Sequence, residues 1–143
     1  MYVFTVLLIV FLFVSIYGYI ESALHQKKIL SIPIRIHING TRGKSSVTRL
    51  IGAALREAGI KTITKVTGTY PRLILENGCE VAIYRKADAN IIEQLSIVKF
   101  ASNRKAQAIV MECMAVQPQY QWITETKMLH STVGVITNVR LDH

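Results

Sequence analysis

The chain has 143 residues, of which 50% are hydrophobic, and its formal net charge is +8. This length allows one domain with a hydrophobic core of its own. The basic residues are scattered and form no nucleic-acid-binding motif, which argues against nucleic acid and for nucleotides, acidic metabolites or anionic lipids as partners. The two cysteines, Cys79 and Cys113, have no metal-binding spacing.

The first 20 residues contain no charged side chain. As a helix, at about 1.5 Å per residue, they would span about 30 Å, the thickness of a bilayer's hydrocarbon core. Lys27, Lys28 and Arg35 follow, and basic residues beside a membrane helix stay in the cytoplasm. We therefore predict a single-pass anchor in the cell membrane over residues 1–20, a stalk over 21–31 and a cytoplasmic domain over 32–143. A cleaved signal peptide or a buried core helix is the alternative, but no basic residue precedes the run and no Ala-x-Ala follows it.

The domain begins with isoleucines at positions 32, 34, 36 and 38 that alternate with other residues, which predicts a strand. A glycine-containing loop follows over residues 40–46. Apolar residues at helical spacing then predict a helix over Ser45–Ala58 that Gly59 ends. The expected apolar stripe of this helix consists of Val47, Leu50, Ile51, Ala54, Leu55 and Ala58.

The rest of the chain alternates between strand and helix patterns. Strands are predicted over residues 61–66, 81–84, 108–114 and 132–137, and helices over 91–101 and 118–129. This alternation predicts an α/β fold with a parallel sheet flanked by helices.

The loop Gly40-Thr41-Arg42-Gly43-Lys44-Ser45-Ser46 joins a strand to an amphipathic helix, which is the setting of a phosphate-binding loop. Glycines let the backbone N–H groups approach phosphate oxygens, and the helix N-terminus attracts the same anion. Lys44 would supply a charge to the phosphates and Ser45 a hydroxyl to Mg²⁺. The common phosphate loop has a glycine where this chain has Ile38, so the loop is a shorter variant. A chance glycine-rich turn is the alternative.

Two further features lie at predicted strand ends. Glu112 closes an apolar run, where a carboxylate is costly unless it is paired or bound to metal, so we expect either a metal ligand or a structural ion pair. Asp142-His143 at the end of the chain are ordinary metal ligands, although terminal residues are more often disordered.

Together these features resemble the Mur ligase family of ATP-dependent amide ligases. Members show Gly-Thr-x-Gly-Lys-[Ser/Thr]-[Ser/Thr], then a Glu at a strand end, then Asn-x-x-x-Asp-His. This chain has residues 40–46, Glu112 and Asn138-Val139-Arg140-Leu141-Asp142-His143 in the same order. The anchor and the segments 38–50, 67–69 and 112–116 are most similar to the membrane-anchored ligase subunit of poly-γ-glutamate (capsule) synthase.

The resemblance implies the ATP-binding central domain of a Mur ligase, present only in part, and ATP with Mg²⁺ (or Mn²⁺) as cofactors. The reaction it implies activates a glutamate carboxylate as an acyl phosphate and joins it to the amine of another glutamate, with membrane subunits of a synthase as partners. Lys44, Glu112 and His143 would be catalytic, with Ser45, Glu112 and His143 as metal ligands. Gly40 to Ser46 and Asn138 would bind the nucleotide, and Thr67, Gly68 and Thr69 would line the acceptor side.

Family members continue well past the Asp-His pair. The chain is therefore expected to be a fragment with little or no ligase activity alone. A membrane-anchored nucleotide-binding protein without catalysis, or another phosphate-loop enzyme such as a kinase or GTPase, is the competing interpretation.

Overall fold

A six-stranded sheet with the strand order β4-β3-β2-β5-β1-β6 forms the centre of the computed structural model, which describes residues 2–68, 70–84 and 90–140. Its strands are β1 (Ile34–Asn39), β2 (Thr62–Val66), β3 (Arg72–Ile74), β4 (Glu80–Ala82), β5 (Ala108–Glu112) and β6 (Val133–Ile136). The helices are α1 (Tyr2–Leu30), α2 (Lys44–Glu57), α3 (Glu93–Asn103) and α4 (Pro118–Ile123), and α4 continues into the π-helix η1 (Thr124–Leu129). The predicted α/β class is confirmed.

The sheet is parallel over β2, β5, β1 and β6 and antiparallel over β2, β3 and β4. The predicted parallel sheet is confirmed over β2, β5, β1 and β6, whereas the edge formed by β3 and β4 is antiparallel. The expected strand at 81–84 is β4, displaced to 80–82, and β3 was not predicted because it has only three residues. A short connection around Asn77-Gly78 joins β3 to β4, and such a turn permits only antiparallel neighbours.

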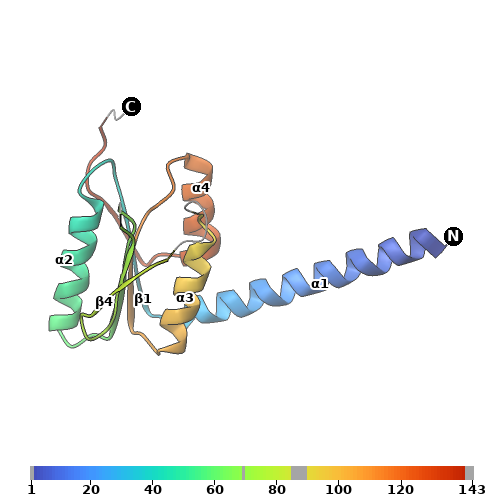
Figure 1. Ribbon diagram of the computed structural model, residues 1–143, viewed down its shortest axis with the longest axis horizontal. Helices are drawn as coiled ribbons and strands as arrows, with labels where there is room; N and C mark the ends of the chain where they lie inside the picture. The colour runs from blue at the N-terminus through green and yellow to red at the C-terminus, as the bar shows by residue number, and fades with distance from the viewer. Residues whose placement is uncertain (1, 69, 85–89, 141–143) are drawn as a thin grey trace.

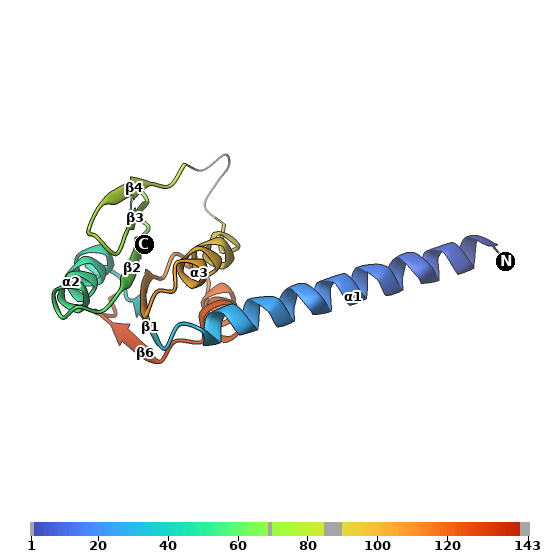
Figure 2. The same cartoon turned by 90° about the horizontal axis from the view of Figure 1, so that it is seen from below.

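Helices cover both faces of the sheet (Figures 1 and 2). α2 lies on one face, and α3, α4 and the C-terminal end of α1 lie on the other. We call these the α2 face and the α3 face. The expected Gly59 ending is confirmed, since Gly59 has φ +79° and the N–H groups of Gly59 and Ile60 donate to the carbonyls of Arg56 and Leu55.

The contact surface of α2 is narrower than the sequence predicted. Val47, Ile51 and Leu55 pack against the sheet, but Leu50 is 70% exposed. Small residues complete the buried side, where a Cβ built on Gly52 would lie 2.1 Å from Thr64 Oγ1. The helix backbone therefore approaches β2 closely, and the stripe turns away from Leu50.

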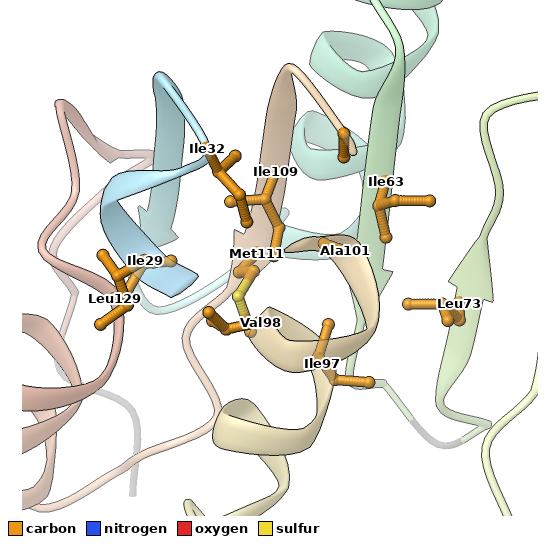
Figure 3. Packing of buried hydrophobic residues seen from close by; sticks show 11 residues of the cluster. Ile29, Ile32, Ile63, Leu73, Ile97, Val98, Ala101, Ile109, Met111 and Leu129 are labelled. Carbon is orange, nitrogen blue, oxygen red and sulfur yellow. The ribbon is translucent and has the colours of Figure 1, made fainter. Parts of the chain in front are cut away.

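The larger hydrophobic cluster fills the α3 face, where residues of α1, β2, α3, β5 and η1 meet (Figure 3). Ile29 of α1 and Leu129 of η1 are fully buried in it. Residues 21–30 continue α1 as a helix, but its last turn enters this core instead of standing apart from the domain as a stalk. The expected stalk is thus partly domain.

A buried lysine lies beside this cluster. Lys65 on β2 is fully buried, and its Nζ contacts Glu93 Oε1 (2.7 Å) and Gln94 Oε1 (3.1 Å) at the start of α3. The pair fixes the start of α3 to the end of β2. Sequence reasoning missed it, because a lysine in a short strand is normally exposed.

Candidate nucleotide site

The site lies where neighbouring parallel strands send their connections to opposite faces of the sheet. β1 leads into α2 on one face, and β5 leads toward α4 on the other (Figure 1). In open parallel sheets, ligands bind in the crevice at such a switch point, beyond the carboxyl ends of the strands. Ile38 pairs with Glu112 at this end, which brings the predicted loop and the predicted carboxylate together.

Two glycines shape the loop. Gly40 has φ +129°, and a Cβ there would lie 2.2 Å from Thr137 Oγ1, so the loop passes close to the end of β6. Gly43 has φ +81° and precedes α2 as an N-cap residue without a side-chain cap. The first-turn N–H groups of α2, at Lys44, Ser45 and Ser46, are therefore disposed to receive an anion.

Ser45 and Glu112 form the polar centre of the site. The Ser45 hydroxyl donates to Glu112 Oε2 (2.9 Å), and the Thr67 backbone N–H donates to the same oxygen (2.8 Å). Glu112 is 4% exposed, so these contacts hold a carboxylate at the strand end. Hydroxyl and carboxylate oxygens are the ligands that Mg²⁺ prefers, and they fit that metal.

Lys44 folds over the loop. Its Nζ donates to the carbonyls of Gly40 (2.6 Å) and Thr41 (3.2 Å), which keeps a positive charge inside the turn. Because a lysine side chain has several rotatable bonds, the ammonium group can move from these carbonyls to a phosphate oxygen without a change in the loop backbone.

The segment after β6 braces the loop. The Asn138 side chain accepts from the Arg42 N–H (3.1 Å) and donates to the Arg42 carbonyl (2.9 Å), while the Thr137 hydroxyl donates to the same carbonyl (2.7 Å). Both polar atoms of the Asn138 amide are thus used for support, and direct nucleotide contact by Asn138 stays a prediction. Sequence reasoning missed Thr137. The feature that could have identified it is its position directly after a predicted strand, where it can lie beside the end of β1.

A second brace is made of side-chain amides. Asn39 Oδ1 accepts from the Gly40 N–H (2.8 Å), and Asn39 Nδ2 donates to Gln121 Oε1 (3.0 Å). Gln121 Nε2 in turn donates to the carbonyls of Ala115 (3.1 Å) and Val116 (3.2 Å). This series of hydrogen bonds fixes the distance between the phosphate-type loop and the segment after Glu112. Gln121 comes from a distant helix, so no local sequence signal marked it.

A pocket of about 550 Å³ opens between these braces. It is lined by loop residues, by the segment after β5 and by the end of β6, including Gly40, Lys44, Val116, Gln121 and Asn138. This volume is within the range of about 300–1,000 Å³ for small-molecule sites.

A histidine–glutamate pair lies next to this pocket on the α3 face. His37 Nδ1 contacts Glu125 Oε2 at 2.9 Å, and Glu125 Oε1 accepts from the Ser131 hydroxyl (2.6 Å). Burial would lower the pKa of His37, but interactions with Cys113 and Glu125 outweigh that effect and raise the pKa to about 9. The hydrogen bond from His37 lowers the pKa of Glu125 to about 2. The pair is charged near neutral pH and joins η1 to β1.

Comparison with known proteins decides the family. The model of the Mur ligase middle domain matches residues 38–143. The chain belongs to the Mur ligase family. This match begins at the end of β1 and includes the loop, Glu112 and the segment from Asn138 to His143, which are the motifs that carried the predicted resemblance.

Comparison with individual proteins gives relatives of the same family. The chain is 50% identical over 133 residues to the "Capsule biosynthesis protein CapB" of Bacillus anthracis, covering 92% of this chain and 29% of that protein. It is 46% identical over 132 residues to the "PGA synthase CapB" of Bacillus subtilis (strain 168), covering 91% and 34% respectively. A UDP-N-acetylmuramoyl-L-alanyl-D-glutamate--2,6-diaminopimelate ligase of Syntrophomonas wolfei is 34% identical over 111 residues, covering 76% of this chain and 20% of that ligase. The chain thus spans about a third of the length of the CapB relatives.

Some predicted residues lie outside this description. His143, expected as a metal ligand, and Thr69, expected on the acceptor side, are outside the described residues. Gly68 is described, and a Cβ built on it would lie 3.5 Å from Ser45 Oγ. No group of three or more His, Cys, Asp or Glu side chains gathers as a metal site within residues 2–68, 70–84 and 90–140. Within the same residues, Ser45 and Glu112 are the predicted metal ligands that the structure brings into contact.

Proposed function

We propose that this chain is the nucleotide-binding portion of an ATP-dependent ligase that extends poly-γ-glutamate at the membrane. The contact between Ser45 Oγ and Glu112 Oε2 carries the proposal, because it sets two Mg²⁺-type ligands at the mouth of a phosphate-type loop. The substrate class follows from two relatives, one named for capsule biosynthesis and the other as a PGA synthase.

Each described residue has a role in this proposal. The N–H groups at the start of α2 bind phosphate oxygens, and Lys44 neutralises charge on the phosphoryl group that is transferred. Ser45 and Glu112 hold Mg²⁺, with Thr67 N–H fixing the Glu112 carboxylate. Bound Mg²⁺ would neutralise charge on the phosphates of ATP. His143 is proposed as a further metal ligand near the reacting carboxylate, and Thr67, Gly68 and Thr69 as the acceptor side.

The proposed reaction has two steps. The terminal carboxylate of the polymer attacks the γ-phosphorus of ATP, which forms an acyl phosphate and releases ADP. The amine of an incoming glutamate then attacks the acyl carbon, the amide bond forms, inorganic phosphate leaves and the amine loses a proton. Both steps bring anions together, so neutralisation of charge by Lys44 and the start of α2 supplies the largest contribution.

The membrane location is part of the proposal. α1 is long and apolar enough to cross a membrane. Lys27 and Lys28 at its C-terminal end favour a cytoplasmic domain. Membrane subunits of a synthase are the proposed partners.

Nucleotide binding by this chain tests the site directly. A fluorescent ATP analogue should bind in the presence of Mg²⁺, and Lys44→Ala should weaken binding at least about tenfold. The control Lys61→Ala removes the same charge from an exposed position after α2 and should leave the affinity unchanged. Equal binding by Lys44→Ala and the unaltered chain would remove the loop from the proposal.

A second variant separates the metal from the nucleotide. Glu112→Gln should lose the increase in affinity that Mg²⁺ produces while keeping the affinity measured in EDTA.

The ligase reaction is tested in a protein of the relatives' full length, where Lys44→Ala should abolish ATP-dependent amide formation with glutamate. The 143-residue chain should show little or no turnover, and robust turnover by it alone would overturn the proposed division of the enzyme.

A further inference from the structure

The connection between the membrane helix and the domain is rigid. α1 is continuous through Leu30, and Ile29 and Ile32 on either side of its end are both fully buried in the core of the α3 face (Figure 3). The Ser31 and Ser102 hydroxyls lie 2.9 Å apart, which ties the end of α1 to α3. The domain therefore cannot turn freely about α1.

A second contact fixes how far the domain lies from the uncharged part of α1. His25 Nε2 lies 3.0 Å from the carbonyl oxygen of Met128, so η1 is level with His25. His25 lies five positions after Ile20, the last residue of the uncharged run, and this separation corresponds to about 7.5 Å along the helix. The headgroup layer on each side of a bilayer is about 5–8 Å thick. If α1 spans the membrane as proposed above, η1 lies at the headgroups.

The direction of α1 decides which surface faces the lipid. Figures 1 and 2 show that α1 leaves the domain on the α3 face, away from α2. The exposed residues of α3 recur at helical spacing, and they are Ser96, Lys99 and Asn103, with Ile92 exposed just before the helix begins. The buried residues of α3 pack in the core against the sheet, so the exposed ones lie on the other side of the helix, on the face of the sheet from which α1 departs.

The charge of this surface is positive. Lys27 and Lys28 lie in the last turn of α1, Lys99 on α3 and Lys127 on η1, three elements that contact one another at the junction, and Lys99 and Lys127 are exposed. The carboxylates of these elements are engaged or distant, since Glu93 pairs with Lys65, Glu125 pairs with His37, and Glu21 lies beyond the junction on α1. Clusters of lysine just inside a membrane helix favour anionic headgroups.

We infer that Lys27, Lys28, Lys99 and Lys127 form a membrane-docking surface that binds anionic lipid headgroups and holds the domain flat against the bilayer. This inference rests on the proposed membrane span. The strands run across the direction of α1 (Figure 1), so their carboxyl ends, where the nucleotide pocket lies, are at the side of the domain and not on the face from which α1 departs. A polymer made there would remain close to any membrane-embedded partner.

Fluorescence quenching in lipid nanodiscs tests the docking surface. The chain with Cys79→Ser carries a nitrobenzoxadiazole label at Ser96→Cys on α3 or, as a control, at Ala53→Cys on α2, while Cys113 stays buried. A nitroxide attached to the choline headgroup is the quencher, in phosphatidylcholine discs with or without phosphatidylglycerol. We expect quenching about twofold stronger at Ser96→Cys than at Ala53→Cys, and stronger still with phosphatidylglycerol.

Charge variants complete the test. Lys99→Gln/Lys127→Gln should reduce the quenching at Ser96→Cys, whereas Lys61→Gln/Lys105→Gln, beside the amino ends of β2 and β5, should not. Equal quenching of both labels, or quenching without dependence on the first pair of lysines, would overturn the docking surface. Incorporation into nanodiscs is measured in the same samples, so a chain that fails to insert refutes the proposed membrane span and not the docking surface alone.

Discussion

The two faces of the sheet bury different kinds of side chains. On the α2 face most buried groups are apolar or carry hydroxyls, Gly52 packs against Thr64, and the one carboxylate described there, Glu112, accepts from the Ser45 hydroxyl at the strand end. The α3 face holds two ion pairs with a buried cation, Lys65–Glu93 and His37–Glu125. Close packing positions α2, whose first turn forms the phosphate-type loop. Ion pairs instead join the start of α3 to β2 and the start of η1 to β1, and these two helices contact α1.

The largest expected effect comes from breaking the Lys65–Glu93 ion pair. Lys65→Met should lower the free energy of unfolding by about 3 kcal/mol, because the Glu93 carboxylate, 15% exposed, keeps its charge without this cation. Urea denaturation in detergent micelles measures it. Adding Glu93→Gln should recover most of the loss, and a double variant as unstable as Lys65→Met would show that Lys65 acts by packing instead.

A smaller effect is expected on the α2 face. Gly52→Ala would place a Cβ 2.1 Å from Thr64 Oγ1 and should cost about 2 kcal/mol, because α2 must move away from β2. The same movement displaces the loop, so the affinity for ATP should fall as well. Thr64→Ala removes the clashing atoms and should restore part of both. Unchanged affinity with reduced stability would separate α2 packing from loop geometry.

The histidine pair predicts a dependence on pH. The pKa of His37 is raised from 6.5 to about 9, so its contribution to stability is full below pH 6.5 and is lost as the pH rises through 9. The pKa of Glu125 is lowered from 4.5 to about 2, so its contribution is present above pH 4.5 and is lost as the pH falls toward 2. Glu125→Gln should cost about 1 kcal/mol at pH 6, because the Glu125 side chain is 38% exposed, and should flatten the alkaline decline.

The smallest effect is expected at the edge of α2. Leu50→Ala should change the free energy of unfolding by less than about 0.5 kcal/mol, because the Leu50 side chain is 70% exposed. Thermal unfolding of this variant provides the reference for the other three. A loss above about 2 kcal/mol would mean that another surface covers Leu50.

Much of the fold followed from local sequence patterns. The alternating isoleucines predicted β1, the run from Ala108 predicted β5, and Gly59 predicted the end of α2, because each pattern reflects a local backbone preference or a repeated burial. The order of the loop, Glu112 and the Asn-x-x-x-Asp-His segment over residues 138–143 predicted the family. β3 escaped prediction because three residues carry too little periodicity, and its antiparallel pairing depends on neighbours in space.

The sequence alone determined the loop, its carboxylate and the apolar helix, since spacing and composition encode these without knowledge of contacts. Only the tertiary structure decided how they are joined. The contacts of Glu112 with Ser45 and Thr67, of Asn39 with Gln121 and of His25 with Met128 connect residues 45 to 103 positions apart. Such partners are set by the packing of elements around the sheet, and local periodicity contains no information about them.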